Sequence, residues 1–379
     1  MVFVAGIPLI FYVISIGVAA CYFYVYLFSM LWMVFMRCVK SGDLTAAAVI
    51  FSLGISSEIG TSKLLYMFLN NLVQDLVEGY LYCDSLVIPG SRFDKNIRKT
   101  LRAVKKRAII FWMVIMSNGV VYVIKPFLLP GRHIMEDLLI VYGLEPMFES
   151  PNYEIAYFVT SCGVLCTCYL PANITALLII VSGYTEAQIL ALSKEIKHVW
   201  EDAQYHYGKN YQNLHNASQI NINIKNKIIN EYIKKELTQM VKIHTMNIYL
   251  LHQIEMVFRG AILIEFLLLV VGLIAELLGG LENTYLEIPF AVMQVAMDCL
   301  LGQRVMDASD AFENAIYDCK WENFDIGNMK TILLMLQNSQ KTLKLSAGGV
   351  TMLSFRSLMS LLKSVYSAYT TLRSTMNKK

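Results

Sequence analysis

The sequence contains a run of 35 residues, Val2 to Met36, without a single charged side chain. A membrane-spanning helix needs about 20 mostly apolar residues, so this run is long enough for one crossing and too short for two with a turn. It therefore predicts one long helix. Composition agrees, because 56% of the residues are hydrophobic and only 16% are charged, against roughly 25% charged in soluble domains.

Six further segments have the length and hydropathy of spanning helices. They are residues 44–72, 108–129, 153–183, 260–278, 285–301 and 346–372. The least apolar are the second of the seven, which carries Glu58 and Lys63, and the last, which carries Arg356 and Lys363. We therefore expect an all-α membrane protein in which residues 1–379 form a single seven-helix domain.

The distribution of lysine and arginine between loops predicts the orientation in the membrane. Loops 73–107, 184–259 and 302–345 together hold 22 of these residues, whereas the other three loops hold 3. Basic loops stay in the cytoplasm. The N-terminus is therefore predicted to be cytoplasmic and the C-terminus extracellular, which is opposite to the orientation of G-protein-coupled receptors.

The loop between the fourth and fifth spans is about 75 residues long, which is too long for a plain connection. Residues 186–202 and 224–255 have apolar side chains at helical spacing. We expect the flanking helices to continue into the cytoplasm there. The stretch between them, Tyr205 to Asn223, is rich in Asn, Gln and Tyr and predicts a mobile loop.

Catalytic and metal-binding motifs are missing from the sequence. The six histidines lack metal-ligand spacing, and no Gly-x-Ser-x-Gly or paired His/Cys pattern indicates a nucleophilic enzyme. We expect no enzyme activity, no cofactor, no metal and no nucleic-acid partner. Two intramembrane acids, Glu58 and Asp298, are functional candidates by default, and an ion pair between Glu58 and Lys63 is the alternative for the first.

The last predicted helix carries a stripe of hydroxyl side chains spaced 3, 4, 3, 4 and 3 residues apart. Its members are Ser357, Ser360, Ser364, Ser367, Thr371 and Ser374. This spacing places them on one helix face over nearly five turns. Small hydroxyl residues let helices pack closely, and they also line water-filled pores. Both interpretations stay open, and the pore would require several subunits around an axis.

The C-terminal fifth of the chain resembles the insect odorant receptors. The resemblance lies in Cys299, Gly302, Ser309, residues 315–317, Trp321, residues 340–348, residues 361–367 and residues 370–373. Insect gustatory receptors, which are close relatives, end in a different pattern. The order and spacing of these residues across some 75 positions make the match specific to the odorant receptors.

This resemblance implies an odorant-gated, non-selective cation channel subunit that acts in olfactory signal transduction at the plasma membrane of a sensory neuron dendrite. It implies a heterotetramer with a co-receptor subunit, surrounded by membrane lipid. The cytoplasmic helices in 184–259 and 302–345 would hold the subunits together, with contacts from Tyr317, Trp321 and residues 340–346. Segment 346–372 would line the pore through Ser360, Ser364, Ser367, Thr371, Leu372 and Ser374. The pore would be narrowest near Thr371 and Leu372.

The resemblance also implies a pocket for a small volatile ligand in the outer half of the helix bundle. The predicted orientation gives the candidates there, which are Phe51, Gly54, Asn118, Tyr122, Tyr157, Thr160, Phe290 and Met293. Ordinary helix packing is the alternative for any one of them, and we expect three or four to contact ligand. A gustatory-type channel and a G-protein-coupled receptor are the alternative functions, and the loop charges contradict the second.

Overall fold

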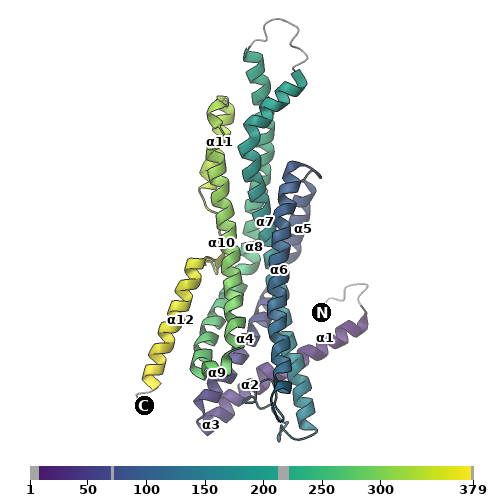
Figure 1. Ribbon diagram of the computed structural model, residues 1–379, viewed down its shortest axis with the longest axis vertical. Coiled ribbons are helices and arrows are strands. Elements are labelled where there is room, and N and C mark those ends of the chain that lie inside the picture. The colour runs from purple at the N-terminus through teal and green to yellow at the C-terminus, as the bar shows by residue number, and fades with distance from the viewer. Residues whose placement is uncertain (1–7, 70–71, 212–221, 377–379) are drawn as a thin grey trace.

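The computed structural model describes residues 8–69, 72–211 and 222–376. Figure 1 shows an elongated bundle that is almost entirely helical. The first helical rod is continuous from residue 9 to residue 41, and the predicted start at Val2 lies outside the described residues. The rod consists of α1 (Leu9–Tyr22), the π-helical η1 (Phe23–Ser29), α2 (Met30–Trp32), the π-helical η2 (Met33–Cys38) and α3 (Val39–Ser41).

The second and third spans are joined by a helical hairpin. This region consists of α4 (Leu44–Leu69), α5 (Leu72–Ser85), α6 (Arg92–Ile124) and the 3-10 turn η3 (Lys125–Leu128). α6 begins where Ser91 caps it, because the Ser91 side chain accepts a hydrogen bond from the Asp94 amide. The basic residues of loop 73–107 therefore lie largely on the first four turns of α6.

Two very long helices form the axis of the molecule. α7 (Asn152–Tyr211) has 60 residues and α8 (Ile222–Gly279) has 58, so at 1.5 Å per residue each is close to 90 Å long. A bilayer core is only about 30 Å thick, so both helices are long enough to project far beyond it. In Figure 1 their ends stand above the rest of the bundle. The predicted loop at Tyr205 to Asn223 is wrong at 205–211 and 222–223, which are helical; residues 212–221 lie outside the described residues.

The C-terminal quarter begins with α9 (Leu281–Thr284) and α10 (Glu287–Tyr317), followed by η5 (Trp321–Asn323) and α11 (Ile326–Ser339). A small antiparallel hairpin of β1 (Ser346–Ala347) and β2 (Thr351–Met352) comes next. The final helix, α12 (Phe355–Met376), therefore starts nine residues later than the predicted 346. The backbone reverses direction at Gly348 and Gly349, both of which have positive φ, so a helix could not run through this point.

Five stretches of the described residues are long and apolar enough to cross a membrane. They are Leu9–Ser41, Leu44–Met67, Arg92–Leu128, Asn152–Lys209 and Asn223–Gly279. The other two predicted spans, in α10 and α12, are less apolar because they carry residues such as Asp298, Arg356 and Lys363. These two helices need partners that shield their polar side chains from lipid.

Three large apolar clusters hold the helices together. One joins α4, α6, α7, α8, α10 and the start of α12, and a second joins the projecting parts of α7, α8, α10 and α11. The third packs the first helical rod against α4, α7 and the segment between η3 and α7. α12 contacts only α8 and α10 to any extent, and in Figure 1 it stands at the edge of the bundle with the C-terminus.

Candidate functional site

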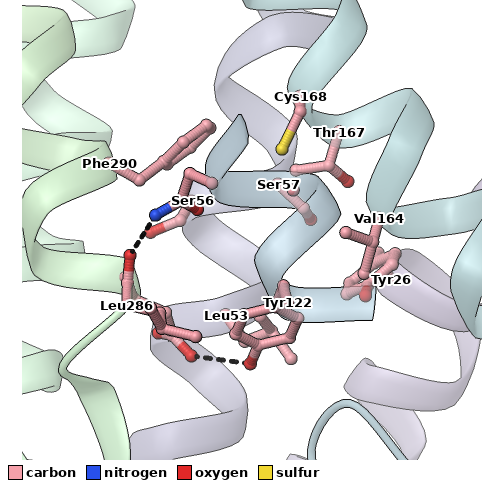
Figure 2. Close-up of a pocket in the computed structure, with 13 residues that line it drawn as sticks. Tyr26, Leu53, Ser56, Ser57, Tyr122, Val164, Thr167, Cys168, Leu286 and Phe290 are labelled. Carbon is pink, nitrogen blue, oxygen red and sulfur yellow. Dashed lines mark hydrogen bonds between the residues drawn. The ribbon is translucent and has the colours of Figure 1, made fainter. Parts of the chain in front are cut away.

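A small pocket lies between α4, α6, α7 and α10, where the first helical rod crosses them. Figure 2 shows its lining side chains converging from these helices. They are Tyr26, Leu53, Ser56, Ser57, Asn118, Gly119, Tyr122, Val164, Thr167, Cys168, Leu286, Glu287 and Phe290. A largely apolar lining with a few polar groups is typical of small-molecule sites.

Three polar contacts fix the wall that faces α10. The Asn118 side-chain amide donates to the Leu286 carbonyl oxygen at 3.0 Å. The Tyr122 hydroxyl donates to a Glu287 carboxylate oxygen at 3.5 Å, and the Ser52 hydroxyl donates to the other at 3.0 Å. These contacts tie α6 and α4 to the start of α10, and the two from α6 are the dashed lines in Figure 2.

The helices approach closely beside this pocket because glycine stands at the crossing. A Cβ atom added at Gly119 of α6 would lie 2.7 Å from the Cys168 sulfur of α7. The missing side chain therefore lets these two helices close one side of the pocket.

The structure brings three of the eight predicted ligand residues together, since Asn118, Tyr122 and Phe290 all line this pocket. Asn118 and Tyr122 lie one helical turn apart on α6, which is why both reach the same cavity.

The other five lie elsewhere in the same half of the bundle. Gly54 packs directly on Met30, and Thr160 is buried with its hydroxyl bonded to the Ala156 carbonyl oxygen. Tyr157 donates to the Val123 carbonyl oxygen at 2.9 Å. Phe51 and Met293 are half-buried, and neither they nor the other three line the pocket.

Sequence reasoning missed the residues that the first helical rod and α4 supply. Leu53, Ser56 and Ser57 lie one to three positions from Gly54, which was selected, so the helix was right and the face was wrong. Glu287 carried a usable signal, because an acid at the apolar start of a predicted span is unusual.

A buried ionic cluster lies deeper in the same bundle. The Lys63 ammonium is 2.5 Å from a Glu265 carboxylate oxygen and 3.5 Å from one of Asp298. The three side chains are 3%, 0% and 0% exposed, and they join α4, α8 and α10. Lys63 therefore pairs with these two acids rather than with Glu58, which is half-buried.

The hydroxyl stripe of α12 is on its outer surface. Ser360, Ser364, Ser367, Thr371 and Ser374 are all exposed, as is Leu372, whereas Val365 and its apolar neighbours Leu358 and Leu361 pack on the main core. Ser364 and Thr371 donate to backbone carbonyl oxygens one turn earlier in their own helix. Each hydroxyl keeps acceptor capacity free on the exposed face.

The segment between η3 and α7 covers the pocket end of the bundle. Glu136 is buried there and accepts a long hydrogen bond, 3.5 Å, from Tyr122. On its surface His133 contacts Asp137 at 2.6 Å, and this hydrogen bond raises the pKa of the histidine. The described residues contain no group of three or more His, Cys, Asp or Glu side chains that could hold a metal ion.

Comparison with known proteins places the chain in a recognisable class. A family model described as 7tm Odorant receptor matches residues 283–366, from α9 into α12. Odorant receptor 30a of Drosophila melanogaster is 28% identical over 163 residues, which are 39% of this chain and 41% of that protein. Odorant receptor 22b of the same species is 26% identical over 148 residues, 37% of each chain. The chain thus aligns with about two fifths of the length of these relatives.

The fold matches a solved structure over nearly the whole chain. The insect olfactory receptor OR5 from Machilis hrabei superposes with a TM-score of 0.74 at 12% identity, covering 96% of this chain and 88% of that one. The structure of the same receptor in complex with eugenol gives a TM-score of 0.72 at the same identity and coverage.

The fold is that of a seven-helix membrane protein and is similar to the fold of the insect olfactory receptor OR5. The resemblance to the insect odorant receptor family, which the C-terminal motifs indicate, is confirmed by the family model and the curated relatives.

Proposed function

We propose that this chain is an odorant-gated, non-selective cation channel subunit of the plasma membrane of a sensory neuron dendrite, and that its partner is a co-receptor subunit in a heterotetramer. The observation that carries the proposal is that the pocket and the hydroxyl stripe lie on two separate parts of the molecule. The bundle encloses a small, mostly apolar pocket, while α12 turns a face of hydroxyl groups away from the same bundle.

The exposed face of α12 supports a pore rather than packing within the monomer. A polar stripe on a membrane helix avoids lipid, and no other helix of the described chain covers Ser360, Ser364 or Ser367, which are all exposed. If copies of α12 from several subunits surrounded an axis, their hydroxyl stripes would face a water-filled pore instead of lipid. Thr371 and Leu372, near the predicted extracellular end, form the narrow point.

The projecting helices supply the surface for assembly. Tyr317 and Trp321 are 67% and 39% exposed, and they border an apolar groove with Ile326 and Leu333. Large exposed apolar side chains at a groove are typical of protein interfaces. We assign this part of α10 and α11, together with the ends of α7 and α8, to contacts between subunits.

Helix α10 connects the pocket to the pore helix. Phe290 of α10 lines the pocket, and three turns later Gly302 lies against the β-hairpin that precedes α12, close to the Leu353 carbonyl oxygen. Ligand that binds more tightly to one position of α10 shifts the population toward the corresponding position of α12. The outer end of α12 then moves outward and the pore opens.

Whole-cell recording from cells that express this chain with a co-receptor subunit tests the proposal. An odorant panel should evoke inward cation current that persists when the pipette contains a G-protein inhibitor, since no second messenger is involved. Thr371→Trp should abolish or strongly reduce that current. Thr370→Trp, about 100° around the helix, is the matched control and should retain it. Current that Thr371→Trp leaves unchanged, or that the inhibitor removes, contradicts the proposal.

A further inference from the structure

Two buried carboxylates beside the pocket lack a positively charged neighbour. Glu287 lines the pocket and is 5% exposed, and Glu276 of α8 is 0% exposed. Ser56, which also lines the pocket, donates to a Glu276 oxygen at 3.2 Å. The other Glu276 oxygen has no hydrogen-bond partner among the described residues. The acceptor groups of both acids thus adjoin one cavity.

Three other buried acids of the described chain have cations. Glu186 contacts Arg107 and Arg304 at 2.7 and 3.1 Å, and Glu265 and Asp298 share Lys63. No lysine or arginine of the described residues lies within ion-pair distance of Glu276 or Glu287. A buried carboxylate without a partner is costly, and in membranes it marks a functional site by default.

Lys125, the first residue of η3, does not line the pocket. Its ammonium lies over the rings of Tyr122 and Tyr285, 5.8 and 5.5 Å from their centroids. It acts on Glu136, where burial raises the pKa of the carboxyl and Lys125 lowers it. Lys125 therefore forms no ion pair with Glu276 or Glu287, and the described residues supply no cation to this wall of the pocket.

We propose that this pocket takes a small ligand with a protonated primary amine and an apolar body, which rests on the proposed function of the chain as an odorant receptor. The ammonium group lies at Glu287 and Ser56, within reach of the field of Glu276. It has three N–H donors for these oxygens, and the tyrosine rings of the pocket add cation–π attraction. The apolar body packs on Phe290 and Val164.

Three ligands that share one aromatic body test this inference. 2-Phenylethylamine, 2-phenylethanol and ethylbenzene differ only in their ability to present an ammonium, a hydroxyl or no polar group. Binding is measured as the ligand-induced rise in melting temperature of the purified full chain, and function as evoked current in cells with a co-receptor subunit. The amine should bind wild type at least tenfold more tightly than the alcohol or the hydrocarbon.

Isosteric variants locate the charge. Glu287→Gln and, independently, Glu276→Gln should weaken amine binding at least tenfold and leave binding of the alcohol within twofold. Glu282→Gln, the same change at an exposed acid, is the matched control and should alter neither.

Equal binding of the three ligands, or amine binding that survives both variants, overturns the inference. Amine binding that the variants weaken, but without evoked current, supports the inference and contradicts the proposed channel function instead.

Discussion

Replacing Lys63 by Met removes the only cation of the buried ionic cluster and keeps an apolar side chain of similar length. The ammonium lies 2.5 and 3.5 Å from the carboxylates of Glu265 and Asp298, and neither acid is exposed at all. Apart from Lys63, their oxygens have no hydrogen-bond partner among the described residues. The substitution therefore leaves two uncompensated carboxylates between α4, α8 and α10.

Breaking a buried ion pair from one side costs about 3–5 kcal/mol, because the remaining charge stays buried. We expect Lys63→Met to lower the free energy of unfolding by that amount. On the scaling of globular chains this corresponds to a fall of about 4–6 °C in melting temperature for 379 residues. Thermal unfolding of the purified full chain, followed by intrinsic fluorescence, measures the shift.

A triple variant separates charge from packing. Lys63→Met with Glu265→Gln and Asp298→Asn removes all three charges and keeps the shapes, so it should recover more than half of the loss. Lys40→Met, at an exposed lysine of α3, controls for the substitution itself. The reasoning is refuted if Lys63→Met melts within 1 °C of wild type, or if the triple variant is less stable than the single one.

Two further predictions concern α10 and the projecting helices. Gly302→Ala places a Cβ about 2.2 Å from the Leu353 carbonyl oxygen, so it should lower the free energy of unfolding by about 1–3 kcal/mol and reduce the evoked current. Gly327→Ala in α11, where the added Cβ meets only ordinary contacts, is the control and should change neither. Equal melting temperatures of the two variants would contradict this prediction. Burial against Phe312 lowers the pKa of His244 to about 4. Between about pH 6.5 and pH 4 the folded chain therefore binds fewer protons than the unfolded chain. Its free energy of unfolding should fall by up to about 3 kcal/mol as the pH is lowered through this range. His244→Phe should flatten that part of the stability–pH curve, and an unchanged slope would count against it.

The architecture could be predicted because a bilayer of known thickness requires about 20 apolar residues for each spanning helix, and such runs can be read from the sequence. The uncharged run before Met36 and the helical spacing of residues 186–202 and 224–255 both correspond to observed helices. The hairpin at Ser346 to Met352 could not be predicted in the same way. Its residues are apolar enough to continue a span, and it exists because Ser346 bonds to Glu255 of α8 and the Gly348 amide bonds to the Arg259 carbonyl oxygen.

For the pocket, the sequence could predict only the half of the bundle in which it lies. Hydropathy places a residue at a depth in the membrane but leaves open the face of the helix on which a cavity forms. Asn118 and Tyr122 were selected from their predicted depth alone, and both line the pocket because they lie one turn apart on α6. The place of Tyr26, Leu53 and Val164 in the lining follows from how the first helical rod crosses the bundle.

Cysteine accessibility on α12 tests most directly whether its hydroxyl face lines the pore. Ser367→Cys should make the odorant-evoked current sensitive to a membrane-impermeant, positively charged thiol reagent applied from outside, because Ser367 is exposed on that face. Leu361→Cys, whose side chain packs on the core, and the wild type with its own cysteines should stay insensitive. Block of the Leu361→Cys current with no effect on Ser367→Cys would show that the opposite face of the helix meets the permeating ions.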